Sequence, residues 1–116
     1  GPVVSAQEIN GMIHAVHTVY IAGALKSYLV DLAEASRRHP EIELGLSPRA
    51  TLQLAAATRA HAAARGRNYA TPDDVKAVSI SALAHRIIVR TDRGAALSPE
   101  DAVREVFEAV AVPVAR

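Results

Sequence analysis

Three places in this 116-residue chain carry a Ser or Thr that is followed directly by Pro. They are Ser47-Pro48, Thr71-Pro72 and Ser98-Pro99. A Ser or Thr side chain accepts a hydrogen bond from a free backbone N–H of the first helical turn, and Pro suits the first helical position because its missing N–H is not needed there. Each pair therefore predicts the start of a helix, and together they divide the chain into short helices.

Two more helices are expected before the first of these starts. Ser5, with Glu8 three residues later, forms a capping box at the start of one of them. The apolar face of this helix comprises Ile9, Met12, Ile13 and Val16, at the spacing i, i+3, i+4 and i+7. The other helix is expected from about Ile21 to Arg38, because β-branched residues before it favour a break and Pro40 ends it.

Local signals also set the ends of the later helices and the segments between them. Gly66 is expected to close the third helix in the left-handed conformation, and Asp74 completes a capping box at the start of the fourth. Residues 41–46 are expected to be a connector with a local acidic patch. The β-prone residues 87–89 are expected to be a short extended connector, and residues 92–94, Asp-Arg-Gly, a turn.

Alanine supplies 24 of the 116 residues, whereas the aromatic side chains are only Tyr20, Tyr28, Tyr69 and Phe107. A core of Ala, Leu, Val and Ile lets helix backbones approach closely. We therefore expect an all-α fold, an orthogonal bundle of four to five helices that forms one domain over residues 1–116. Gly1 and Pro2 resemble the remnant of a cleaved tag.

The charge balance excludes one broad class of function. The chain has 13 Lys and Arg against 12 Asp and Glu, a net charge of +1, which argues against a general binder of polyanions. It has no cysteine, so a disulfide scaffold, a thiolate metal site and a thiol nucleophile are excluded. This is compatible with a reducing cytoplasm, where we expect the protein. The apolar runs are shorter than the roughly 20 residues that cross a bilayer, so no membrane span is expected.

Catalytic motifs are absent from these residues. No glycine is followed by Lys, so the phosphate-binding loop GxxxxGK[ST] is missing, as are HExxH, GxSxG and CxxC. We expect that this chain alone hydrolyses nothing. His14 and His17 are three residues apart, but no carboxylate lies one helical turn from either, so no metal is expected. His61 is expected to be solvated or half-buried, and His85 to make an internal hydrogen bond; the sequence assigns none of these histidines a function.

Arg49 is the strongest candidate for a functional residue. The start of a helix presents free N–H groups and a partial positive charge, which favour an anion. Arg49 lies in the first turn after Ser47-Pro48, where its guanidinium can reach a phosphate, and Gly45 would let the backbone approach a ligand closely. A solvated surface arginine is the alternative. Three arginines near the other end of this helix, Arg59, Arg65 and Arg67, better suit solubility or a protein neighbour.

Three ordered motifs resemble the C-terminal helical lid of MoxR-family AAA+ ATPases. They are residues 45–50 (Gly-Leu-Ser-Pro-Arg-Ala), 66–75 (Gly-Arg-Asn-Tyr-Ala-Thr-Pro-Asp-Asp-Val) and 83–87 (Leu-Ala-His-Arg-Ile). Residues 2–5 and 28–40 resemble this lid as well, so the resemblance covers nearly the whole chain. Two residues depart from the family pattern: Asn68 stands where the family usually has an acid, and Ala70 where it usually has Val.

The resemblance implies a function that this chain performs as part of a longer parent protein. In such proteins the lid packs over the nucleotide, and an arginine at the start of a lid helix, called sensor 2, reaches the γ-phosphate. Arg49 matches that position, and Gly45, Ser47 and Pro48 would lie beside the nucleotide with it. ATP and Mg²⁺ would be bound by the parent's N-terminal AAA+ core domain, which is absent from these residues.

The resemblance also implies partners. They are the protein's own AAA+ core domain, neighbouring subunits of a hexameric ring, and a partner protein with a von Willebrand A domain. ATP hydrolysis would be coupled to chaperone-like maturation of protein complexes.

Two other readings of the residues stay open at this point. A small histone-fold-like domain that binds nucleic acid would use Arg59, Arg65 and Arg67 and a Thr-Pro-Asp-Asp-Val helix start, although the net charge makes nucleic acid an unexpected partner. A purely structural oligomerisation bundle is the other.

Overall fold

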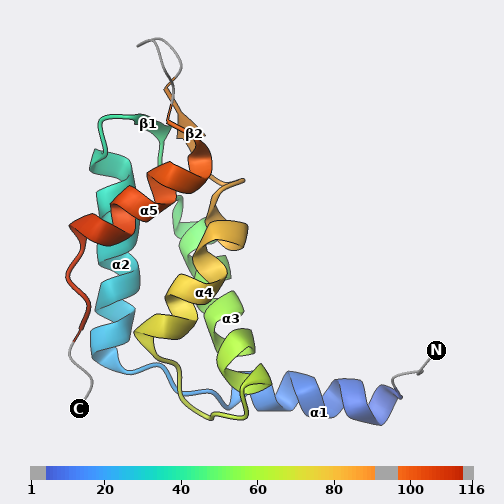
Figure 1. Ribbon diagram of the computed structural model, residues 1–116. Helices are drawn as coiled ribbons and strands as arrows, with labels where there is room; N and C mark the ends of the chain where they lie inside the picture. Colours follow the sequence, from blue (N-terminus) through green and yellow to red (C-terminus); the bar gives the residue numbers. More distant parts are fainter. Residues whose placement is uncertain (1–4, 91–96, 114–116) are drawn as a thin grey trace.

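The computed structural model describes residues 5–90 and 97–113 and confirms the expected all-α class (Figure 1). Its five helices are α1 (Ala6–His17), α2 (Gly23–Arg38), α3 (Pro48–Ala64), α4 (Pro72–Leu83) and α5 (Pro99–Ala109). The expected turn at 92–94 and the family-like residues 2–4 lie outside the described residues. Within the described part of the chain, no helix is long and apolar enough to cross a lipid bilayer.

The three Ser/Thr-Pro pairs begin helices as predicted. Ser47 Oγ accepts a hydrogen bond from the backbone N–H of Ala50 at 3.1 Å, and Ser98 Oγ accepts one from Asp101 at the same distance. Thr71 and Asp74 form the predicted capping box at the start of α4. Gly66 has φ of 75°, and the N–H groups of residues 66 and 67 bond the carbonyls of residues 63 and 62, which closes α3 in a Schellman motif.

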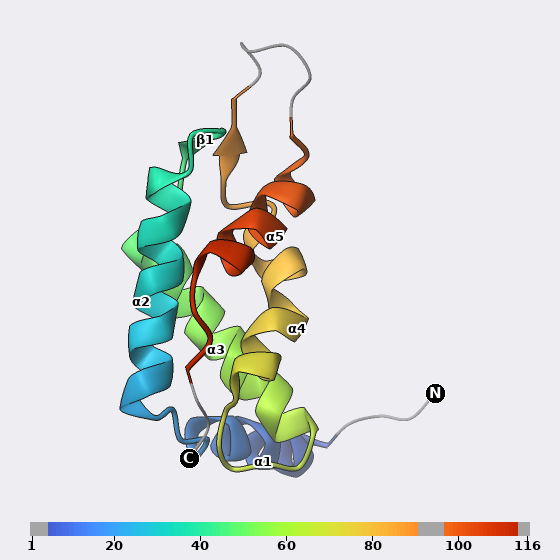
Figure 2. The ribbon, with the colours of Figure 1, turned by 60° about the vertical axis from the view of Figure 1, so that its left-hand side comes forward.

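A two-stranded ribbon replaces the two connectors expected at 41–46 and 87–89. β1 (Ile42–Leu44) pairs antiparallel with β2 (Ile88–Val89), and Figure 2 shows them side by side beyond one end of α5. The backbone N–H of Arg90 extends this pairing to the carbonyl of Glu41 at 2.8 Å. Residues 88–89 are extended, as expected, but each run is too short to be recognised as a strand by itself, so the pairing of the two connectors was not predicted.

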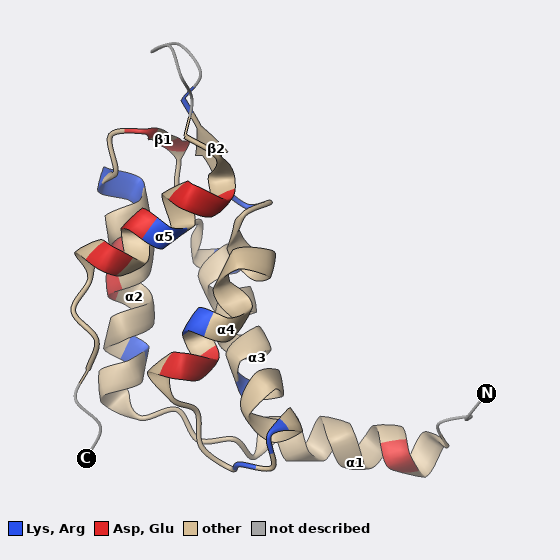
Figure 3. Ribbon diagram, viewed as in Figure 1, with Lys and Arg blue, Asp and Glu red and all other residues tan. Residues whose placement is uncertain are grey.

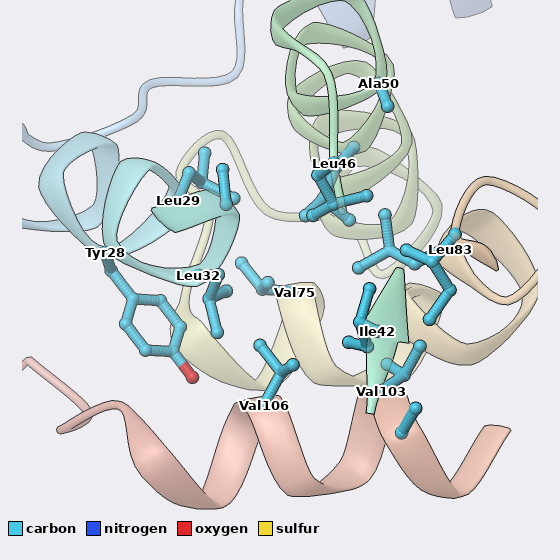
Figure 4. Close-up of a cluster of buried hydrophobic side chains, with 14 of the residues drawn as sticks. Tyr28, Leu29, Leu32, Ile42, Leu46, Ala50, Val75, Leu83, Val103 and Val106 are labelled. Atoms are coloured by element: carbon cyan, nitrogen blue, oxygen red, sulfur yellow. The ribbon is translucent and has the colours of Figure 1, made fainter. Parts of the chain in front are cut away.

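The core lies where α2, α3, α4 and α5 meet, with β1 at its edge (Figure 4). Leu32, Leu54 and Val75 are fully buried and come from three different helices. The Tyr28 ring packs edge-on against Phe107, with the ring centroids 6.3 Å apart, and so joins α2 to α5. This shared core holds the four helices together as one unit.

Helix α1 projects from the end of α3 and contributes no buried residue to this core (Figures 1 and 2). Its predicted apolar face is largely exposed to solvent: Ile9, Met12 and Ile13 are 44%, 56% and 51% exposed. The segment after α1 is anchored by backbone hydrogen bonds, in which Tyr20 bonds Asn68 at 2.8 Å and Ala70 at 2.9 Å. The helix is therefore attached firmly at its base while its apolar face lacks a partner within the described residues.

A buried carboxylate joins the end of α3 to the start of α4. The side chain of Asp74 is fully buried and accepts two hydrogen bonds from the guanidinium of Arg67, each at 2.7 Å. His61 Nδ1 lies 2.7 Å from Asp74 Oδ1, and the backbone N–H and hydroxyl of Thr71 donate to Oδ2 at 2.7 and 3.0 Å. The expectation that Arg67 serves solubility or a protein neighbour was therefore wrong.

These contacts determine the charge state of Asp74. Burial alone would raise the pKa of this carboxyl, but the hydrogen bonds from Arg67, His61 and Thr71 outweigh burial and hold the pKa well below its usual value. The carboxylate therefore stays ionised in the folded protein at pH values where an unfolded chain would take up a proton.

We expect the free energy of unfolding to fall as the pH is lowered from about 5 towards 2. In this range the unfolded chain protonates Asp74 while the folded chain resists it, so acid shifts the equilibrium towards the unfolded state. Asp74→Asn should be less stable than the parent chain at neutral pH and should show a smaller loss in acid. Urea denaturation followed by circular dichroism measures both.

Asp73→Asn is the matched control, because Asp73 is the exposed neighbour on the same helical turn. It should keep the acid sensitivity of the parent chain. An equal loss of stability in acid for the Asp74→Asn chain and the parent chain would contradict the assignment.

Candidate functional site

The four residues proposed from sequence gather where β1 leads into α3. Gly45 and Ser47 lie in the connector, Pro48 is the first residue of α3, and Arg49 is the second. The side chains of Ser47, Pro48 and Arg49 are exposed, and Gly45 is half-buried. The structure thus places the predicted residues together at one helix start, with Arg49 accessible to solvent.

An open groove of about 430 Å³ runs along this junction. Its lining residues are Arg37, Glu43, Leu44, Gly45, Leu46, Ser47, Pro48 and Arg86. Its charged lining residues are two arginines and one glutamate, and the start of α3 adds its partial positive charge. The local electrostatics therefore favour an anion more than the nearly neutral composition of the whole chain suggests.

Arg49 has no hydrogen-bond or ion-pair partner within residues 5–90 and 97–113, whereas several other arginines are engaged. Arg67 binds Asp74, Arg104 binds Asp101 at 2.9 Å, and the Nε of Arg90 donates to the carbonyl of Pro40 at 3.0 Å. Arg86 donates to the side chain of Gln53, which lies one turn after Arg49 on the same face of α3. An exposed guanidinium without an internal partner is available for an external anion.

The connector before Arg49 is held against the end of α2. Ser36 Oγ is buried; it donates to the carbonyl of Ala33 at 2.7 Å and accepts from the backbone N–H of Leu46 at 2.9 Å. Arg37 Nη1 donates to the carbonyl of the same Leu46 at 2.6 Å. Both backbone groups of Leu46 are thus bound by side chains of α2, an arrangement that sequence analysis missed.

Gly45 allows this close approach of the connector to α2. A Cβ at residue 45 would lie only 2.7 to 2.8 Å from backbone atoms of Ser36 and Arg37. From the sequence, this glycine was expected to let a ligand approach the backbone closely. The structure supplies a different reason, since the backbone that approaches is that of α2; contact of Gly45 with a ligand stays a prediction.

Within residues 5–90 and 97–113, the histidines and the remaining basic residues make no second candidate site. His14 and His17 are exposed on α1, and within the described residues no group of three or more potential ligands could hold a metal ion. His61 is half-buried, as expected, and its partner is Asp74. His85 is exposed. Figure 3 shows the Lys and Arg positions of the described residues spread over several helices.

Comparison with known proteins identifies the fold and the family. A family model described as the AAA lid domain matches residues 34–112. The chain belongs to the AAA lid domain family. The lid includes α2 from Glu34 onward and all later elements, and thus the whole groove and Arg49, whereas α1 precedes the matched residues.

The curated relatives place this lid among MoxR proteins. It is 35% identical to Chaperone MoxR1 of Mycobacterium tuberculosis over 81% of this chain and 28% of the relative, and 34% identical to Protein MoxR of Methylorubrum extorquens over 84% and 33%. The uncharacterized protein YeaC of Bacillus subtilis is 32% identical over 99% of this chain and 36% of its own length. The lid therefore spans about a third of these relatives.

A solved structure shows the same fold. The crystal structure of a candidate ATPase from Cytophaga hutchinsonii matches this lid with a TM-score of 0.82 at 23% identity, over 93% of this chain and 36% of that chain. A match over 93% of 116 residues cannot leave out all 12 residues of α1. At least part of α1 thus has a counterpart in a chain that continues well beyond the lid.

We expect Gly45→Ala to lower the free energy of unfolding by about 2 kcal/mol, because the added methyl group meets backbone atoms that cannot rotate away. Denaturation of the purified chain measures this change.

Gly23→Ala is the control for Gly45→Ala, since no atom lies within 4 Å of a Cβ at residue 23. Its stability should be unchanged or raised by up to about 1 kcal/mol. If both variants unfold like the parent chain, the close contact between residue 45 and α2 is not a constraint on the fold.

Proposed function

We propose that this lid closes over ATP bound to the core domain of a MoxR-like AAA+ ATPase and that Arg49 is its sensor 2 arginine. The observation that carries the proposal is the exposed guanidinium of Arg49, which has no partner within the described residues and lies at the start of α3. The named MoxR relatives and the lid family match support it.

Arg49 would act by electrostatic stabilisation. A guanidinium carries a permanent positive charge and donates paired hydrogen bonds that fit phosphate oxygens. Charge spreads over the oxygens of a phosphoryl group during transfer, so a positioned arginine stabilises the transition state more than the bound nucleotide. The same contact ties the position of the lid to the presence of the γ-phosphate.

The residues of this lid suit the phosphate side of such a site. The groove beside Arg49 is lined by Arg37 and Arg86, with Glu43 as its one carboxylate. Mg²⁺ in proteins is held by carboxylates together with phosphate oxygens. We therefore assign the ligands of Mg²⁺ to the core domain, and the lid contributes cationic groups.

The exposed face of α1 is proposed to pack on that core domain. Ile9, Met12 and Ile13 are each about half exposed, and an isolated helix of 12 residues is only marginally stable in water. About two thirds of each curated relative lies outside the part that matches this lid. In this proposal, that remaining part contains the core domain on which α1 packs. An apolar stripe of this size is consistent with an interdomain contact.

The assembly and partners that we propose for the full-length protein are those that the resemblance to MoxR proteins implies. We propose that the full-length protein forms a ring, which we expect to be hexameric, in the cytoplasm, where ATP is available. We further propose that its hydrolysis cycle drives chaperone-like maturation of protein complexes, with a protein carrying a von Willebrand A domain as a candidate partner. The relative named Chaperone MoxR1 supports this role.

We expect Arg49→Ala in the full-length ATPase to lower kcat about 10²-fold or more, because a transition-state contact is lost. The dissociation constant for nucleotide should change much less, since the bound ground state depends less on this charge. Steady-state ATP hydrolysis and nucleotide titration measure the two quantities separately.

Arg65→Ala is the matched control for Arg49→Ala, because Arg65 is an exposed arginine at the opposite end of the same helix. It should retain the turnover of the parent protein. Unchanged turnover in Arg49→Ala would contradict the sensor assignment. ATP hydrolysis by the 116-residue chain alone would contradict its role as an accessory lid.

We expect Ile13→Asp to leave the stability of the 116-residue chain unchanged and to impair ATP hydrolysis by the full-length protein. The charge would be solvated in the isolated chain, whereas packing of α1 on the core domain would bury it. Denaturation and ATPase measurements on the same variant separate the two effects.

His14→Asp places the same charge on the opposite face of α1 and should be neutral in both measurements. Normal hydrolysis with Ile13→Asp would show that the apolar face of α1 does not contact the core domain.

A further inference from the structure

We infer that Arg37, at the end of α2, is a positioning residue that holds Arg49 in place. The inference rests on the proposed function of Arg49 and adds a residue that lies 12 positions earlier in the chain and on a different helix. Arg37 would act through the backbone of Leu46, and its own guanidinium would not need to touch the nucleotide.

Two hydrogen bonds connect the end of α2 to the connector that leads into α3. Arg37 Nη1 donates to the Leu46 carbonyl at 2.6 Å, and the neighbouring Ser36 binds the Leu46 N–H at 2.9 Å. The Leu46 side chain is 1% exposed and lies in the core, so the residue is fixed by its side chain and by both backbone groups. Three residues later in the chain comes Arg49.

The segment between Leu46 and Arg49 has little freedom to absorb a displacement. Ser47 caps α3 through Ala50, the ring of Pro48 fixes its φ angle, and Arg49 already belongs to the helix. The connector also approaches α2 so closely that only glycine fits at residue 45. A shift at Leu46 would therefore move the start of α3, and the guanidinium of Arg49 with it.

The two side chains that bind Leu46 differ in what their substitution would do to the fold. The Ser36 hydroxyl is buried and also bonds the carbonyl of Ala33, so its removal would disturb the core. Arg37 is exposed, so the loss of its hydrogen bond should leave the fold intact. Arg37 is thus the residue at which positioning can be tested apart from folding.

The decisive experiment is a double-mutant cycle in the full-length ATPase with Arg37→Met, Arg49→Ala and the combined variant. Met keeps the aliphatic stem of Arg37 and removes the donor. We expect Arg37→Met to lower kcat about tenfold with little change in the dissociation constant for nucleotide, because a displaced guanidinium loses transition-state contact. In the Arg49→Ala background the same substitution should cause no further loss, since nothing remains to be positioned.

Two variants serve as controls. Arg37→Lys keeps a charged donor that can reach the Leu46 carbonyl and should restore most of the turnover. Arg38→Met makes the same substitution at the next residue, which is exposed and has no hydrogen-bond or ion-pair partner among residues 5–90 and 97–113, and should be neutral. Losses from Arg37→Met and Arg49→Ala that multiply would overturn the inference and would indicate that Arg37 contacts the nucleotide itself.

A measurement on the 116-residue chain separates this inference from the proposed function. The NMR signal of the Arg49 Nε–H group, and of the backbone amides at the start of α3, should shift in Arg37→Met and return in Arg37→Lys. Unchanged signals would overturn the positioning role whatever the ATPase data show. If the signals shift while Arg49→Ala hydrolyses ATP normally, the positioning role stands and the proposed function of Arg49 fails.

Discussion

The buried carboxylate of Asp74 is the contact on which the arrangement of the bundle depends. It is fully buried and receives hydrogen bonds from Arg67 and His61 on one side and from Thr71 on the other. Removal of one member of such a network would leave a charge without a partner in a place that water does not reach. These hydrogen bonds hold the turn between α3 and α4 in a fixed geometry. The start of α4 is thereby positioned so that its apolar residues pack into the core.

Helix α3 is held at its other end by a different set of contacts. There the connector is pressed onto α2 at Gly45, and Leu46 is bound by Ser36 and Arg37. The helix has 17 residues and is roughly 25 Å long, with Arg49 at one end and the Asp74 network at the other. The backbone of Arg49 therefore has a defined position at the start of this helix.

Signals that act within one turn could be predicted from the sequence, whereas contacts between distant residues could not. Ser47, Thr71 and Gly66 determine helix ends through neighbours three or four residues away, and all three were predicted. The pairing of β1 with β2 joins residues more than 40 positions apart, and neither run is long enough to indicate a strand alone. The reason for Gly45 was likewise missed, because it depends on the backbone of α2.

The nearly neutral charge of the chain is compatible with an anion site, because such a site does not need a surplus of basic residues, and several arginines of the described residues are engaged within the chain. Arg67 and Arg104 are paired with carboxylates, and Arg37 and Arg90 donate to backbone carbonyls. A binder of extended polyanions would need many such groups free on one face, whereas the Lys and Arg positions of the described residues are spread over several helices (Figure 3). A single phosphoryl group needs only one available guanidinium beside a helix start. Arg49 lies at such a helix start without a partner among the described residues, and Arg37 and Arg67 bind the segments at the two ends of its helix.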